Sequence, residues 1–274
     1  MKVSLLLFIS LVICGEVEKY TFINKFYDGQ IINYKHDFML SFDVPGAGEV
    51  RQGFNYSILQ ESLGKKDAFF LIRSTISNIV SINSYGSKLI TDFDASAINN
   101  ISCMLFINDD GELDHIETED KYNYLEEKFY THYMGMDADN YKYPFGQNAV
   151  GLSVGDSWTV VQDSIKFYLG DGSIESIMSD SSIYTLKKVK LKKGREIAYI
   201  GELGYLTCEV RMIIGSEFMD GVQSGTFKST HRYDIGTGEM ILDKGSGSML
   251  GEFKIVDAEF KTLSNFTHKT KRVK

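Results

Sequence analysis

A GxSxG pattern is the first feature of this sequence that could do chemistry. Residues 151 to 155 read Gly-Leu-Ser-Val-Gly, a spacing that places a serine nucleophile in many hydrolases. That chemistry needs Ser153 on a strained turn between a strand and a helix, where its hydroxyl is exposed. Here a polar connection precedes Ser153, and a strand beginning at Trp158 follows it. The sequence therefore predicts a glycine-flanked turn, and a serine hydrolase is the least favoured of three functional hypotheses.

Acidic residues crowd one stretch and would bind a metal ion if they converged within about 2 to 2.6 Å of it. Their spacing lacks the DxDxDG pattern of a calcium loop, and the histidines form no HxxxH or HExxH motif. We therefore expect no metal site and, without a glycine-rich phosphate loop, no cofactor. His231 lies on an apolar strand face, which predicts a hydrogen-bonded core histidine. The acidic stretch comprises Asp109, Asp110, Glu112, Asp114, Glu117, Glu119 and Asp120, with His115 among them.

The composition narrows the classes of partner. The chain has 274 residues, of which 43 % are hydrophobic and 24 % are charged, as in an ordinary globular protein. Its formal net charge of −8 would repel nucleic acid, and the sequence shows no basic stripe with interleaved aromatic residues. We therefore expect no nucleic-acid partner.

Apolar residues at alternate positions dominate the sequence and predict β-strands, which must position any site. In residues 225 to 235, Phe227, His231 and Tyr233 share one face. Lys228 and Arg232 share the other face. This pattern is typical of a half-buried antiparallel strand.

Glycine-containing turns separate the predicted strands, and short turns join antiparallel neighbours into a meander. Residues 245 to 251 carry glycine at alternate positions, so the missing side chains would let the sheet bend or let another element lie close. The predicted fold is mainly β: a long antiparallel meander that forms a curled sheet or half-barrel. The turns are expected at Asp110-Gly111, Gly170-Asp171-Gly172, Asp220-Gly221 and Gly236-Thr237-Gly238.

One helix is predicted near residues 119 to 134, packed on a face of the sheet. Tyr122, Leu125, Phe129 and Tyr133 recur at helical spacing, and Gly135 suits the C-terminal end. An aromatic stripe of this kind is typical of core packing rather than of a ligand site.

The first residues predict export. One lysine precedes an uncharged apolar run from Val3 to Gly15, which fits a secretory signal segment and is too short to span a bilayer. Cys14 follows Leu-Val-Ile, which resembles the lipobox of bacterial lipoproteins, although Ile13 stands where that pattern has a small residue. Lipidation of Cys14 and ordinary cleavage near residues 14 to 16 both remain open. No later stretch is apolar enough to span a membrane, so we expect the mature chain in the periplasm, in the cell envelope or outside the cell.

Two further cysteines, Cys103 and Cys208, alternate with apolar neighbours, which predicts that both are small buried residues. Export would permit a disulfide between them. The pairing stays open, because two cysteines on strands need not be neighbours.

The chain divides into five predicted parts. A signal segment (1–15) precedes a first β-rich half with the helix (16–134) and a connection (135–153). A second β-rich half (154–267) and a basic tail (268–274) follow. The two halves could form one continuous sheet.

The second half carries a resemblance. Val154-Gly155-Asp156-Ser157-Trp158 opens its strands, and residues 233 to 239 form a later hairpin. With the signal segment, these resemble exported bacterial β-rich proteins of unknown function over roughly the last 120 residues. The predicted meander is also similar in outline to lipoprotein-carrier proteins of the bacterial envelope, which are curved half-barrels around an apolar cavity. That resemblance implies lipid or lipoprotein handling and assigns no role to a particular residue.

The sequence thus favours an exported, non-catalytic protein that binds an apolar ligand or lipid through its alternating Phe, Tyr and Ile side chains. The alternative is a structural or assembly protein that contacts a protein partner through a sheet edge or an exposed aromatic patch. Hydrolysis through Ser153 is the third hypothesis.

Overall fold

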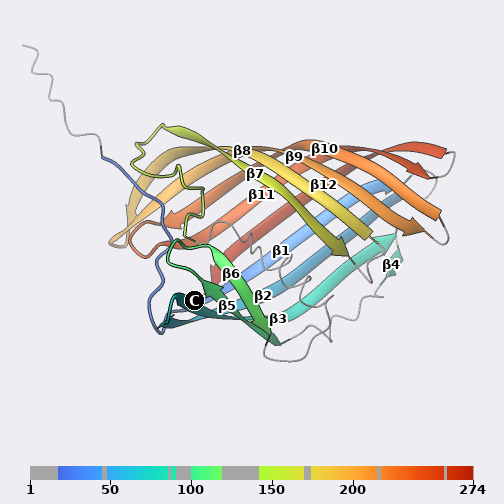
Figure 1. The fold of residues 1–274 in the computed structure, drawn as a ribbon. Coiled ribbons are helices and arrows are strands. Elements are labelled where there is room, and N and C mark those ends of the chain that lie inside the picture. Colours follow the sequence, from blue (N-terminus) through green and yellow to red (C-terminus); the bar gives the residue numbers. More distant parts are fainter. Residues whose placement is uncertain are drawn as a thin grey trace, which may run out of the picture.

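A computed structural model describes residues 18–44, 48–85, 88–90, 100–118, 142–169, 174–214, 217–255 and 258–273 (Figure 1). The predicted signal segment with Cys14, the predicted helix at 119 to 134 and the predicted turn at 170 to 172 lie outside these residues. Within the residues described, no helix has the length and apolar character needed to cross a membrane.

The described residues form one antiparallel sheet of 12 strands, so the predicted fold class is confirmed. Its order is β6-β5-β3-β2-β1-β12-β11-β10-β9-β8-β7, and β4 pairs with β3 outside this path. The sheet curls without closing, with β6 and β7 at its two ends (Figure 1). The strands are β1 (Ile31–Val44), β2 (Gly48–Lys66), β3 (Phe69–Tyr85), β4 (Lys88–Ile90), β5 (Ile101–Ile107), β6 (Leu113–Thr118), β7 (Ser157–Leu169), β8 (Ile174–Lys192), β9 (Arg195–Ile214), β10 (Glu217–Asp234), β11 (Glu239–Ile255) and β12 (Ala258–Val273).

The pairing of β1 with β12 joins the early and late parts of the chain. Phe38 lies opposite His268, and His36 lies opposite Thr270, although 234 residues separate His36 from Thr270 in sequence. The other neighbours along the path are consecutive strands of a meander, except β3 and β5, which are separated in the chain by β4. The early and late strands therefore share a single sheet.

The two faces of the sheet have different surroundings. We call the inner face the one contacted by the N-terminal arm (18–30) and by the segment 142–156, and the outer face the opposite one. These two segments also hold each other, since Tyr20 pairs with Leu152 in a β-bridge. Burial alternates along β12: even-numbered residues from 260 to 272 are buried or half-buried, and odd-numbered residues from 259 to 271 are exposed. Alternate residues of each strand thus reach either face.

An aromatic core fills one end of the inner face. Phe22 of the arm lies edge-on to Phe145 and to Tyr233, with ring centroids 5.8 and 5.7 Å apart. The indole N–H of Trp158 donates to the Phe145 carbonyl at 2.7 Å, which satisfies the polar atom of a buried ring. A second core lies on β2, β3 and β5 and comprises Ile58, Ile72, Ile76, Cys103, Leu105 and Ile107.

The glycine predictions have two different outcomes. Gly236 and Thr237 lie in the predicted turn between β10 and β11, where their N–H groups donate to Asp234 Oδ1 at 3.0 and 3.2 Å. The turn predicted at Asp220-Gly221 is wrong, because both residues lie within β10. A Cβ at Gly221 would stand 2.2 Å from the ring of Phe253, so this glycine makes room for an aromatic side chain.

Candidate functional site

Ser153 lies in a turn that precedes β7. Its N–H donates to Asp156 Oδ2 at 2.8 Å, and its carbonyl accepts from the Asp156 N–H at 3.0 Å. Gly151 and Gly155 flank the turn with φ angles of +65° and +102°, in agreement with the predicted turn. The Ser153 hydroxyl is buried and has no hydrogen-bond partner in the described part of the chain. The structure therefore places no base beside the hydroxyl, whereas a serine nucleophile needs one.

The first residues of the acidic stretch, Asp109 and Asp110, form a hairpin turn with Gly111, as expected, whereas Asp114 and Glu117 lie in β6. The N–H of Gly111 donates to the Asn108 carbonyl at 2.9 Å, and Gly111 has a φ of +85°. His115 Nδ1 lies 2.7 Å from Asp114 Oδ2, and both side chains are exposed. Among the residues that the structure describes, no three or more ligating side chains converge to hold a metal ion.

The two cysteines lie far apart in the order of the sheet. Cys103 is buried on β5, and Cys208 is half-buried on β9. The strands β3, β2, β1, β12, β11 and β10 stand between β5 and β9 along the sheet. No disulfide joins the two thiols within the described residues.

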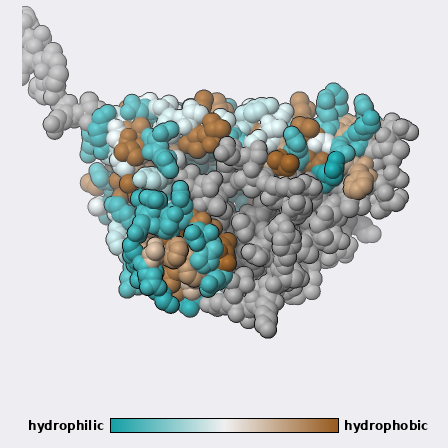
Figure 2. All heavy atoms as spheres, viewed as in Figure 1, coloured by the Kyte–Doolittle hydropathy of each residue, from teal (hydrophilic) through white to brown (hydrophobic). Residues whose placement is uncertain are grey.

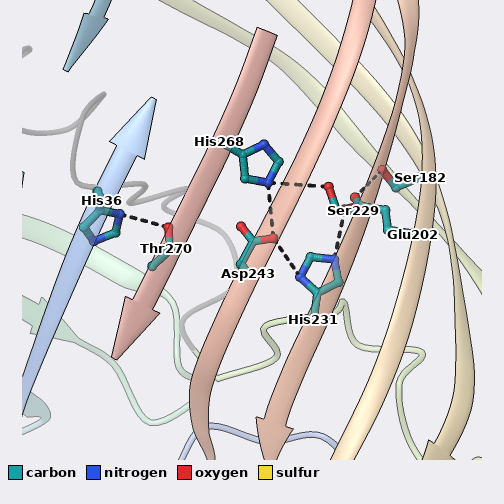
Figure 3. A network of polar contacts seen from close by, with 8 residues as sticks. All are labelled: His36, Ser182, Glu202, Ser229, His231, Asp243, His268 and Thr270. Carbon is teal, nitrogen blue, oxygen red and sulfur yellow. Dashed lines mark hydrogen bonds and ion pairs between the residues drawn. The ribbon is translucent and has the colours of Figure 1, made fainter. Parts of the chain in front are cut away.

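A cluster of buried and half-buried polar side chains lies on the inner face (Figure 3). The register places His231 of β10 directly opposite Asp243 of β11, with Asp243 Oδ1 3.2 Å from His231 Nδ1. Glu202 of β9 contacts the other nitrogen of His231, with its Oε2 3.0 Å from Nε2. Ser182 of β8 donates to Glu202 Oε1 at 2.8 Å, and His268 Nε2 lies 3.2 Å from Asp243 Oδ1. Five adjacent strands, β8 to β12, thus supply one connected group, which we call the histidine cluster.

The two carboxylates keep His231 protonated. Burial of His231 lowers its pKa, but contacts with Asp243 and Glu202 raise it more, and the pKa rises from 6.5 to about 9. His231 holds the pKa of Glu202 and, together with His268, the pKa of Asp243 below their usual values, against the effect of burial. Only 8 % of the His231 side chain and 7 % of the Glu202 side chain are exposed. The buried positive charge of His231 is therefore paired with carboxylates inside the protein.

Ser229 also reaches the histidine cluster but does not form a catalytic relay with it. Its Oγ lies 3.5 Å from His268 Nε2, the same nitrogen that lies 3.2 Å from Asp243 Oδ1. In a serine–histidine–aspartate relay, the serine and the carboxylate contact different nitrogens of the ring, so that one nitrogen accepts the serine proton. Here one nitrogen faces both groups. The geometry supports a structural role of the cluster.

His36 shows the opposite electrostatic behaviour a short distance away on β1. Its Nδ1 lies 3.0 Å from Thr270 Oγ1, and its ring stacks on Tyr56 with centroids 4.8 Å apart. Burial lowers the pKa of His36 from 6.5 to about 4, although Asp243 partly opposes this shift. His36 is therefore neutral at pH 7, whereas His231 is charged.

Sequence reasoning identified His231 as a hydrogen-bonded core residue but missed its two carboxylate partners. One signal was present for Glu202. The apolar alternation of Leu206 and Cys208 on β9, continued backwards in steps of two, places Glu202 on the same face. Asp243 offered no comparable signal, because its position depends on the register of β10 against β11.

Half-buried phenylalanine rings form a second feature of the inner face. Phe227 of β10 and Phe266 of β12 have ring centroids 6.2 Å apart, and the ring of Phe266 and the Cβ of Phe227 both lie close to Gly247 of β11. A Cβ at Gly247 would stand 2.6 Å from Phe266 and 2.7 Å from Phe227. The predicted close approach at residues 245 to 251 is thus present. We call phenylalanine wall the inner-face set Phe38, Phe227, Phe253, Phe260 and Phe266.

No protein-family model matches this chain, and no curated protein matches its sequence. Among solved structures, an outer membrane channel of Pseudomonas putida F1 is 10 % identical, with 91 % of this chain and 97 % of that chain covered and a TM-score of 0.26. OpdQ of Pseudomonas aeruginosa is 6 % identical, with 90 % and 99 % covered and a TM-score of 0.25. Similarity at this level does not establish a shared fold or function.

Proposed function

We propose that this chain is an exported, non-catalytic binding protein that holds an apolar ligand or lipid against the phenylalanine wall. The observation that carries the proposal is that four of the five rings, all except the buried Phe253, stay accessible on a face whose other apolar parts are filled by the chain itself. Phe38 is 37 % exposed, and Phe227, Phe260 and Phe266 are half-buried. By contrast, Phe22 and Phe145 fill the aromatic core with less than 2 % exposure.

The glycines of β9 to β11 support this use of the wall. The ring of Phe227 lies over Gly204, the ring of Phe266 lies over Gly247, and the ring of Phe253 lies over Gly221 and Gly251. The missing side chains let these rings lie flat against the sheet instead of interdigitating with neighbouring side chains. Phe253 also stacks on Phe260, with centroids 5.5 Å apart. Ligand sites of this kind are mostly apolar with a few polar groups, and the half-exposed His268 beside Phe38 supplies a polar group here.

Lipid extraction and fatty-acid titration test the proposal. Organic extraction of the purified chain is expected to release lipid, and a fluorescent fatty acid is expected to bind. Phe38→Ser should weaken fatty-acid binding about tenfold, since it removes one aromatic contact from the ligand. Leu250→Ser is the matched control, because Leu250 is 66 % exposed on the outer face. Absence of both lipid and fatty-acid binding, or equal losses in the two variants, would refute the proposal.

The assembly hypothesis rests on a different observation, the open sheet. The path of paired strands ends at β6 and β7, and β7 is 13 residues long. An edge strand that offers unpaired backbone groups can pair with another chain. Size-exclusion chromatography with cross-linking separates the hypotheses: a monomer that binds fatty acid supports ligand carriage, and a stable oligomer without bound lipid supports assembly.

A further inference from the structure

Six cations gather on the outer face of four adjacent strands. The register pairs Thr230 with Lys244 and Lys244 with Lys269, and places Lys269 opposite Asp37. Two residues after Lys269 on the same face of β12, Lys271 lies opposite Lys35 of β1 on one side and Leu242 of β11 on the other. All six cationic side chains belong to exposed residues. We call them the basic band: Lys35 of β1, Lys228 and Arg232 of β10, Lys244 of β11, and Lys269 and Lys271 of β12.

The charges of the basic band are not compensated by neighbouring acids. Asp37 is the one carboxylate on the outer face within 35–37, 228–232, 242–246 and 267–271. No ion pair involves any of the six cations among the residues that the structure describes. This local excess of positive charge stands on a chain whose formal net charge is −8. An anionic partner would therefore be attracted to this face and repelled by the remainder of the molecule.

The far end of the same face provides an internal reference. There Lys261 of β12 pairs with Glu252 of β11, and Arg211 of β9 pairs with Asp220 of β10 at 2.7 Å. Cations and acids alternate between neighbouring strands at that end. The uncompensated charge is thus a property of one end of the sheet and not of its outer face as a whole.

Exposed apolar side chains border the basic band. Lys228 lies opposite Leu203 of β9, which lies opposite Ile183 of β8, and both apolar residues are 48 % exposed. Tyr205, two residues further along β9 on the same face, is 51 % exposed. Figure 2 shows hydrophilic and hydrophobic side chains intermingled along the upper part of the viewed side. A groove of about 820 Å³ runs among the band residues Lys228, Arg232, Lys244 and Lys269.

We propose that the basic band binds the anionic surface of a phospholipid bilayer. Lysine and arginine attract anionic headgroups, and tyrosine with apolar side chains favours the boundary between headgroups and acyl chains. A soluble polyanion would use the cations but would gain nothing from Leu203 and Ile183. Four strands spaced about 4.8 Å apart give a broad contact surface rather than a pocket for one small ion. This contact is independent of the phenylalanine wall, which lies on the opposite face.

Vesicle sedimentation of the full chain tests the proposal. We expect binding to vesicles of phosphatidylglycerol mixed with phosphatidylcholine, weak binding to phosphatidylcholine alone, and release in about 1 M salt, where the screening length falls to about 3 Å. Lys244→Gln with Lys269→Gln should weaken binding about 30-fold. The matched control, Lys254→Gln with Lys261→Gln, changes the same two strands and the same net charge at the far end, and should weaken binding by less than about threefold.

Each other outcome overturns the proposal. Equal losses in the two double variants would mean that net charge alone controls binding. Equal binding to both vesicle types would indicate apolar attachment, or a lipid anchor, that does not use the band. Tight binding to inorganic polyphosphate without binding to phosphatidylglycerol vesicles would assign the band to a soluble polyanion. Thermal unfolding of each variant verifies that it is folded.

Discussion

The inner histidine cluster and the outer basic band are separated by the thickness of one sheet. The charge of His231 in the cluster is buried and paired, whereas the charges of the band are exposed and, within the described part of the chain, unpaired. Strand β12 contributes to both: His268 reaches the cluster, while Lys269 and Lys271 belong to the band. The buried charge of His231 is matched by carboxylates on both sides, whereas the exposed lysines have no paired acid among the described residues. Buried charge must be compensated for the fold to be stable, and exposed charge need not be. The comparison therefore predicts that the cluster controls stability and the band controls binding.

Removing Asp243 should have the largest effect. Asp243→Asn takes away the carboxylate that contacts both His231 and His268, and leaves His231 with Glu202 as its single acidic partner. We expect a loss of about 3 to 5 kcal/mol in the free energy of unfolding, measured by chemical denaturation. Asp220→Asn is the control, since it breaks an exposed ion pair with Arg211 and should cost less than about 1 kcal/mol. Equal costs for the two variants would contradict the assigned role of the cluster.

The pH dependence of stability should reveal the same cluster with a smaller effect. The folded state raises the pKa of His231 from 6.5 to about 9, so its stabilising contribution is complete below pH 6.5 and is lost as the pH rises through about 9. The expected loss is about 3 kcal/mol. It is measured as the difference in unfolding free energy between the original chain and His231→Gln across this range. The control Leu250→Ser, an exposed change that removes no titratable group, should give a difference that stays flat with pH.

A difference for His231→Gln that does not change between pH 6.5 and 9 would show that His231 is not held protonated. The acid side offers an independent test. Burial lowers the pKa of His36 to about 4, so the folded state resists its protonation. The contribution of neutral His36 to the free energy of unfolding should therefore be complete above pH 6.5 and decrease as the pH falls toward 4. The two histidines thus predict losses in opposite directions of pH.

The sequence contained most of the fold, because alternation is a local property of a strand. Phe227, His231 and Tyr233 were assigned to one face of a strand from their spacing, and the structure places all three on the inner face of β10. The glycines at 245 to 251 predicted close approach by another element, which the ring of Phe266 and the Cβ of Phe227 make at Gly247. The error at Asp220-Gly221 has a physical cause: a glycine that receives an aromatic ring from the next strand has the same local signature as a turn.

The two charged regions could not be predicted in the same way, because they depend on register between distant strands. The predicted basic tail at 268 to 274 supplies Lys269 and Lys271, but the other four cations come from three further strands, so the linear sequence does not show the band that the folded sheet forms. Likewise, Glu202, His231 and Asp243 meet only when β9, β10 and β11 are aligned. A slip of one residue would turn each of these side chains to the other face. Local patterns therefore identify the faces of a strand, and the register decides which charges become neighbours.

The smallest predicted effect is an increase in the free energy of unfolding, whereas the first two predictions are decreases. It tests most directly whether the basic band differs from the histidine cluster. Lys244 and Lys269 lie directly opposite each other on β11 and β12 and carry like charges. Like charges in this arrangement repel, so Lys244→Gln with Lys269→Gln should raise the free energy of unfolding by up to about 0.5 kcal/mol at low salt. Lys254→Gln with Lys261→Gln should lower it by a similar amount, because Lys261 loses its pair with Glu252.

Denaturation of both double variants at low salt and in about 1 M salt measures this difference, which screening should abolish. Destabilisation by the Lys244 and Lys269 changes would mean that the band is compensated within the fold, and that it belongs with the histidine cluster. Stabilisation, together with weakened vesicle binding, would instead separate the two regions. A group of charges that lowers stability and contributes nothing to packing is retained for a contact outside the fold, whereas the histidine cluster is retained for the fold itself.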